Sequence, residues 1–360
     1  FSFDAERSFE EQSQDVEGTF VSPLGTVSAW TSAGGPYSKY GDTNEDAYGI
    51  FSSGDILHLV LADGAGGSAS GKVASRLSVV ATHALLAELQ AQEETWMSDL
   101  QALRRKGERP PLDRLQRLLV QRVSKELMRV VTLQQKANRE FFEDEGLDPD
   151  TVSTPGIYGT VAGVLRVQVL GMESPRTFVY ARGDTRVIQL RGDRMVDAGT
   201  TWFLNKAGYD AAARGDAASY WKNPDDHSQL LAALGTEGLD MNLREEDIAL
   251  TETDTKPGDV FLLIGDGIGD IVTDYEIRQI ARSCMNAQGL VDDVLLLQRI
   301  RVLSALRNAS APGTSISLQL SETERTWLTL NEIYYAQNGK EITLSGADNQ
   351  TALVLRIPNP

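Results

Sequence analysis

Short apolar runs separated by turn residues dominate the chain and predict a protein rich in β-strands. Most runs are too short for a typical helix. The expected strands lie at 27–30, 48–51, 56–62, 161–170, 178–181, 187–190, 195–196, 260–264, 316–320, 327–330 and 351–357. The runs 56–62, which is apolar except for His58, and 260–264 are typical of buried strands. Arg191-Gly192-Asp193-Arg194 lies between two of the runs and is typical of a hairpin turn.

Helical periodicity, with apolar residues three and four positions apart, occurs in two parts of the chain. Helices are expected at 73–89 and, after a break at 106–111, at 115–141. A capping box, Thr273-Asp274-Tyr275-Glu276, predicts the start of a later helix, and another is expected at 294–306. Helices grouped between sets of strands, without βαβ repeats, indicate an α+β fold whose packed helices cover the sheets.

Charge and turn residues divide the chain into a short tail and one large domain. Residues 1–20 carry six acids and a single base, Arg7, so we expect a flexible, solvated tail there. Residues 21–360 are expected to form one domain, because α/β folds of this size often form a single unit. Within it, residues 199–230 are polar and glycine-rich, which predicts a flap-like excursion.

Composition excludes several classes of protein. The 360 residues carry 34 basic and 51 acidic side chains, a net charge of −17, which argues against nucleic acid as a partner. No apolar run approaches the length of a membrane span. The single cysteine, Cys284, cannot form an intrachain disulfide, so a reducing, cytoplasmic location is expected. Three scattered histidines make a zinc site improbable.

The acidic residues gather at the ends of the predicted strands. Asp63, Asp184 and Asp266 follow strands, whereas Glu45-Asp46 and Asp348 precede them. If these strand ends converge, the carboxylates would repel one another strongly unless cations or protons neutralise them. Mg²⁺ or Mn²⁺ is the natural partner, because both bind oxygen ligands.

The order of these motifs resembles the metal-dependent serine/threonine phosphatases of type 2C, the PPM family. Six motifs carry the resemblance across about residues 25–357: Asn44-Glu45-Asp46, Asp63-Gly64-Ala65-Gly66-Gly67, Gly159-Thr160, Gly183-Asp184-Thr185-Arg186, Asp266-Gly267-Ile268-Gly269-Asp270 and Asp348-Asn349-Gln350-Thr351. The resemblance implies a four-layer α-β-β-α sandwich, two antiparallel sheets flanked by helix pairs, with metals at one end.

The resemblance also implies a role for each acid at that end. Asp63 would bridge two core Mg²⁺ or Mn²⁺ ions, and the carbonyl of Gly64 would bind the first. The carboxylates of the second ion's site would be Glu45, Asp266 and Asp348. Those of a weaker third ion would be Asp184 and Asp270. Asp46 would act through water. The catalytic residues would be Asp63, Asp266 and Asp46.

The implied activity is hydrolysis of phosphoserine and phosphothreonine in proteins, opposite a cognate Ser/Thr kinase, through a metal-activated water that attacks phosphorus. Two departures bear on it. Gly41 occupies the position of the family's phosphate-binding arginine, and Lys39 is the nearby candidate to replace it. Ala65 replaces a histidine of eukaryotic members, which favours a bacterial-type member. The alternative is an inactive pseudophosphatase that serves as a binding or scaffold module.

Overall fold

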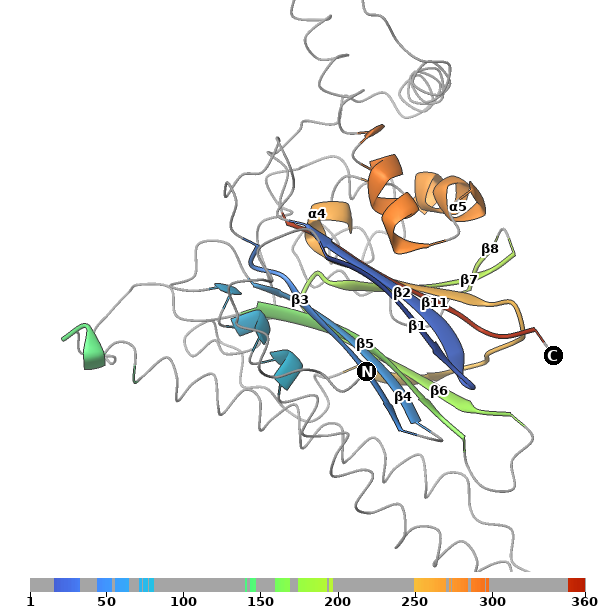
Figure 1. Cartoon of the computed structure of the whole chain (residues 1–360), viewed down its shortest axis with the longest axis horizontal. Coiled ribbons are helices and arrows are strands. Elements are labelled where there is room, and N and C mark those ends of the chain that lie inside the picture. Colours follow the sequence, from blue (N-terminus) through green and yellow to red (C-terminus); the bar gives the residue numbers. More distant parts are fainter. Residues whose placement is uncertain are drawn as a thin grey trace, which may run out of the picture.

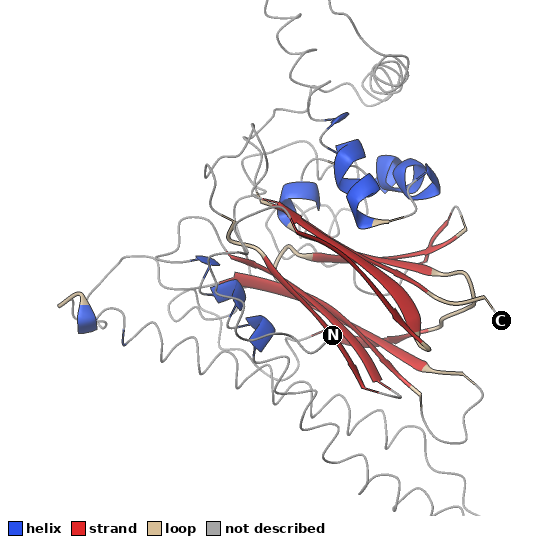
Figure 2. Ribbon diagram, viewed as in Figure 1, coloured by secondary structure: helices blue, strands red, loops and turns tan. Residues whose placement is uncertain are grey.

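The described part of the protein is a sandwich of two antiparallel sheets with helices on its outer faces (Figures 1 and 2). The computed structural model describes residues 16–32, 44–53, 56–64, 159–168, 174–192, 194–196, 249–269, 274–283, 286–294 and 349–359, together with parts of 71–80 and 140–146 and residues 272 and 296–297. Two sheets that face each other bury one side of every strand, and covering helices bury the other.

The strands pair across long stretches of sequence. The first sheet has the order β1 (Val16–Ser22), β2 (Gly25–Ser32), β11 (Gln350–Arg356), β10 (Val260–Ile264), β7 (Arg186–Arg191) and β8 (Arg194–Val196). The second has the order β3 (Ala47–Ser53), β4 (Ile56–Gly64), β5 (Gly159–Val167), β6 (Arg176–Arg182) and β9 (Ala249–Thr253). All neighbouring strands run antiparallel.

Alternate residues of each strand point into the space between the sheets. This core contains Leu59 of β4, Val164 of β5 and Val179 of β6 from the second sheet, opposite Leu263 and Leu353 of the first, all 0% exposed. The opposite residues of the first sheet pack under the helices: Ile188, Ile264 and Val354 contact the cluster that includes Ile268 of α4 (Asp266–Gly269) and Ile277 and Ile280 of α5 (Asp274–Ser283). Burial on both sides explains why these strands are apolar over most of their length.

Most predicted strands are confirmed, with ends shifted by a few residues, and so are the hairpin and the capping-box helix. Gly192 has φ of +61° in the turn between β7 and β8. Strand β9 was not predicted, because Ala249–Thr253 alternates apolar and polar residues only weakly. Strand β1 begins at Val16, within the range expected to be tail, because Val16 to Ser22 pair with β2 despite the acidic surroundings.

Several predictions concern residues outside the described part. They include the tail residues 1–15, the helices at 73–89, 115–141 and 294–306 over most of their length, the excursion at 199–230 and the strands at 316–320 and 327–330. Within the described part, no helix is long and apolar enough to cross a bilayer.

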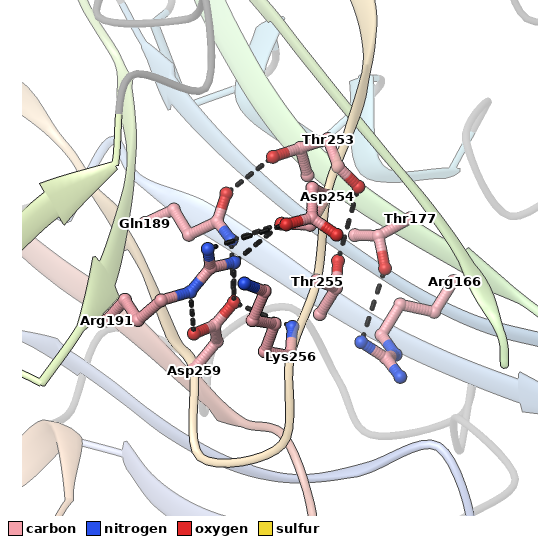
Figure 3. Close-up of polar contacts among 9 residues, drawn as sticks. All are labelled: Arg166, Thr177, Gln189, Arg191, Thr253, Asp254, Thr255, Lys256 and Asp259. Carbon is pink, nitrogen blue, oxygen red and sulfur yellow. Dashed lines mark hydrogen bonds and ion pairs between the residues drawn. The ribbon is translucent and has the colours of Figure 1, made fainter.

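A hydrogen-bonded polar cluster joins the two sheets at the end where β10 begins (Figure 3). Asp259, which is 0% exposed, accepts hydrogen bonds from Arg191 Nε at 2.9 Å and Nη2 at 2.9 Å, Gln189 Nε2 at 2.8 Å and Lys256 N at 2.9 Å. Thr253 of β9 donates to Gln189 Oε1 at 2.5 Å, which links the second sheet to the first. Burial alone would raise the pKa of Asp259, but these donors and the Arg191 charge hold it below its usual value.

A second buried contact crosses the outer face of the second sheet. Tyr180 on β6 lies over Gly163 on β5, and its hydroxyl is 2.8 Å from His58 Nε2 on β4. Burial lowers the pKa of His58 to about 3, so the imidazole is neutral and can share one proton with the phenol. A Cβ at Gly163 would lie 2.2 Å from Tyr180 Cζ, so this packing requires glycine.

We expect Gly163→Ala to lower the free energy of unfolding by about 1–3 kcal/mol, because the new methyl group must displace the Tyr180 ring from the core. Urea unfolding measures the change. Gly18→Ala on β1 is the matched control, since a Cβ there meets nothing within 4 Å. Equal effects of the two substitutions would show that the Tyr180 packing does not restrict Gly163.

Candidate metal centre

Four of the predicted acidic residues lie at neighbouring strand ends. Asp63 is within the end of β4, and Asp184 follows β6 in the second sheet. Asp46 directly precedes β3 of the same sheet, and Asp266 begins α4, one residue beyond the end of β10 of the first sheet. Antiparallel pairing places the end of one strand beside the start of the next, so these residues from both sheets meet at the end of the sandwich where β10 ends.

Direct contacts show that the carboxylates are close together. The backbone N–H of Asp266 donates to Asp63 Oδ2 at 3.2 Å, which joins the two sheets. A Cβ at Gly265 would lie 3.3 Å from Asp46 Oδ2 and 3.4 Å from Asp63 Oδ2. A side chain at residue 265 would therefore point directly at the two carboxylates.

The electrostatic state of Asp63 reflects this crowding. Asp63 is 6% exposed, and burial raises its pKa well above the usual value. The negative charges of Asp266, Asp46 and Asp184 raise the pKa further. The acids thus form one electrostatically interacting group, as expected if the strand ends converge.

Two glycines allow the backbone to pass beside this group. A Cβ at Gly64 would lie 2.3 Å from the carbonyl of Gly71 and 2.7 Å from the backbone oxygen of Glu45. A Cβ at Gly71 would lie 3.0 Å from Glu45 Cδ. The predicted ligand Gly64 is therefore beside Glu45. Sequence reasoning missed Gly71, although its place at the start of the segment after a glycine-rich turn was a signal for close backbone approach.

The donor atoms at this end suit a hard divalent cation. They are carboxylate and carbonyl oxygens, which Mg²⁺ and Mn²⁺ bind in preference to nitrogen or sulfur. Among the residues that the structure describes, no three acidic, histidine or cysteine side chains are arranged as a complete ligand set. The predicted ligands Asp348 and Asp270, and the candidate phosphate-binding residue Lys39 with Gly41, lie outside the described residues.

Comparison with known proteins shows which fold this is. No family model and no curated protein matches the chain. The serine/threonine phosphatase Stp1 from Staphylococcus aureus superimposes with a TM-score of 0.51 at 16% identity, covering 96% of this chain and 100% of that one. A bacterial serine phosphatase superimposes with a TM-score of 0.50 at 15% identity, covering 93% and 98%. The chain has the PPM phosphatase fold.

The fold match confirms the sandwich that the motif order implied. At this level of identity the likeness concerns the arrangement of the backbone. The PPM phosphatase fold here brings together the ends of β4, β6 and β10 and the segment before β3, which carry the acids of four of the six motifs.

We expect Asp63→Asn to stabilise the metal-free protein near neutral pH. Because the folded-state pKa of Asp63 is raised, its ionised form costs folding free energy above that pKa, by about 1.4 kcal/mol for each pH unit by which the folded-state pKa exceeds the unfolded one. This cost disappears as the pH falls through the folded-state pKa to the unfolded value, so the difference between variant and wild type should shrink in acid. Urea unfolding in EDTA at several pH values measures it.

Asp259→Asn is the matched control at the opposite end of the sandwich. The same change there should destabilise the protein by about 1–3 kcal/mol, because the Arg191, Gln189 and Lys256 donors stabilise the ionised carboxylate. Stability changes of the same sign at both positions would contradict the repulsion inferred at Asp63.

Proposed function

We propose that the protein is a metal-dependent phosphatase that hydrolyses phosphoserine and phosphothreonine in proteins. The observation that carries the proposal is the convergence of Asp46, Asp63, Asp184 and Asp266 from two sheets into one group, on the PPM phosphatase fold. A protein that keeps mutually repelling carboxylates in a buried group does so at a cost in stability, which a bound cation offsets.

Different residues would bind two core Mg²⁺ or Mn²⁺ ions and a third ion that is held more weakly. Asp63 and Gly64 would hold the first ion, and the further residues assigned to the second are Glu45, Asp266 and Asp348. Asp184 and Asp270 would hold the third ion, while Asp46 would orient bound water. When bound, such ions make a water molecule nucleophilic near neutral pH and neutralise charge on the phosphoryl oxygens.

The protein scaffold contributes position and exclusion of bulk water. Asp63, Asp46 and Asp184 are at most 8% exposed, so packing restricts their orientation, and Asp63 Oδ2 also accepts a hydrogen bond from the N–H of Asp266. A fixed arrangement of oxygens requires little reorganisation during the reaction, which is how preorganised sites lower a barrier. No covalent nucleophile is required, and Cys284 lies outside every motif.

The proposed activity implies a class of substrate and a cellular location. A phosphorylated protein is the expected partner, and a Ser/Thr kinase would supply it. The single cysteine agrees with a reducing compartment such as the cytoplasm. The pseudophosphatase alternative gains its support from Gly41, because the chain lacks a guanidinium at that position.

We expect Asp266→Asn to abolish Mn²⁺-dependent hydrolysis of p-nitrophenyl phosphate, because it alters a ligand of the core pair. Asp184→Asn should lower kcat while the two tightly held ions remain, as elemental analysis can show. Asp292→Asn, at an exposed helical position, is the control and should leave turnover unchanged. A wild-type protein that binds Mn²⁺ and hydrolyses neither this ester nor a phosphopeptide would support the binding-module alternative.

The substitution Lys39→Ala should raise KM for a small phosphomonoester with a smaller effect on kcat. A guanidinium forms charge-assisted hydrogen bonds of about 1.5–3 kcal/mol each, and a lysine provides only a point charge in its place. For the same reason Gly41→Arg should lower KM. Steady-state kinetics test both, with circular dichroism and metal content as folding controls. Unchanged KM in a folded Lys39→Ala protein would remove Lys39 from the site.

A further inference from the structure

Two buried asparagines bind consecutive backbone amides of the acidic pair Glu45-Asp46. Asn349 Oδ1 accepts a hydrogen bond from the N–H of Glu45 at 2.6 Å, and Asn44 Oδ1 accepts one from the N–H of Asp46 at 3.0 Å. Asn349 is 1% exposed and Asn44 2% exposed, so water does not compete for these bonds. Asn349 therefore ties the backbone that carries both carboxylates to the residue before β11, and Asn44 folds the same backbone into a local turn.

Two threonine hydroxyls connect Asn44 to the first sheet, and Asn349 directly precedes β11 of the same sheet. Asn44 Nδ2 donates to Thr31 Oγ1 at 2.8 Å, and Thr31 Oγ1 is 2.7 Å from Thr351 Oγ1. Thr31 on β2 and Thr351 on β11 are directly paired residues, and both are buried. Asn44, Asn349, Thr31 and Thr351 form what we name the asparagine–threonine bridge.

The bridge continues into the turn that carries Asp266. The carbonyl of Thr351 accepts a hydrogen bond from Gly265 N–H at 3.2 Å. The next residue, Asp266, donates its N–H to Asp63 Oδ2 at 3.2 Å. A continuous set of contacts thus runs from the segment before β3, through β2 and β11, to the turn after β10 and back to β4. It connects the described segments that carry Glu45, Asp46, Asp63 and Asp266.

The choice of amide side chains has an electrostatic reason. The Glu45 and Asp46 amides need oxygen acceptors, and aspartate could supply them. A carboxylate in either place would add a further negative charge to a group in which repulsion already raises the pKa of Asp63. An asparagine supplies a neutral acceptor and, at position 44, a donor for Thr31 as well.

We propose that the asparagine–threonine bridge is a positioning device that sets the affinity of the acidic group for divalent cations. It acts by holding the Glu45-Asp46 backbone against the repulsion that would otherwise push this segment away from Asp63 and Asp266. The inference rests on the proposed metal-dependent function. It adds that residues which carry no charge and contact no substrate determine how well the ligands are preorganised.

The experiment measures two properties that a purely structural role would not change together. Asn349→Leu removes one acceptor, and Thr351→Val removes the hydroxyl while keeping the shape of the side chain. Thr351→Ser restores the hydroxyl, and Thr253→Val removes a buried hydroxyl bond at the opposite end of the sandwich. Hydrogen exchange reports protection of the Glu45 and Asp46 amides without metal, and calorimetric titration of the full chain gives the Mn²⁺ dissociation constant.

Asn349→Leu should remove amide protection at Glu45 and raise the Mn²⁺ dissociation constant by about 10–100-fold, the usual effect of losing a partner that orients a metal ligand. Thr351→Val should act in the same direction more weakly, and Thr351→Ser should bind Mn²⁺ like the wild type. Thr253→Val should lower the melting temperature and leave the Mn²⁺ dissociation constant unchanged.

Two outcomes would overturn the inference, and only the second would also overturn the proposed function. If the wild type binds Mn²⁺ and both bridge variants bind it equally well, while their melting temperatures fall as in Thr253→Val, the bridge only closes the sandwich. If the wild type itself binds no Mn²⁺, there is no centre to position, and the proposed function fails as well. The wild-type titration alone separates these cases. Because Thr351→Val preserves shape, a misfolded Asn349→Leu protein does not prevent the decision.

Discussion

Repulsion between buried carboxylates is the constraint on which the rest of this structure depends. Like charges in a region of low dielectric cost folding free energy, and Asp63, Asp46, Asp184 and Asp266 are held close enough for their charges to shift the Asp63 pKa. The apolar core between the sheets, with leucines and valines that exclude solvent entirely, supplies the stabilisation that opposes this cost. The sandwich thus serves as a rigid holder for an arrangement that would not persist in a flexible chain.

The two ends of the sandwich differ in the groups that surround their buried carboxylates. At one end, Asp259 is surrounded by the donors of Arg191, Gln189 and Lys256, so its negative charge is compensated inside the protein. At the other end, the charges that shift the pKa of Asp63 are also negative. The same residue type therefore stabilises one end and destabilises the other, and carboxylates with strongly raised pKa values cluster at functional sites.

The sequence predicted the parts of the fold that depend on local pattern. Buried strands such as β10, and β4 apart from His58, begin as apolar runs, and from this pattern Asp63 and Asp266 were predicted to lie at strand ends. Strand β9 could not be found this way, because its position comes from pairing with β6 and not from its own composition. The hydrogen-bond partners of Asn44 and Asn349 could not be predicted either, because hydrogen bonds between distant segments depend on a strand register that no local pattern encodes.

The central place of β11 has a consequence for the order of events during synthesis. This strand lies between β2 and β10, and the hydroxyl contact from Thr31 to Thr351 spans 320 positions of sequence. The first sheet therefore remains divided until residues 350–356 have left the ribosome, and pairing across so long a separation is entropically slow. Until then, the edges of β2 and β10 that pair with β11 remain unpaired. The acidic end of the sandwich, which needs both sheets, can be completed only after β11 has been translated.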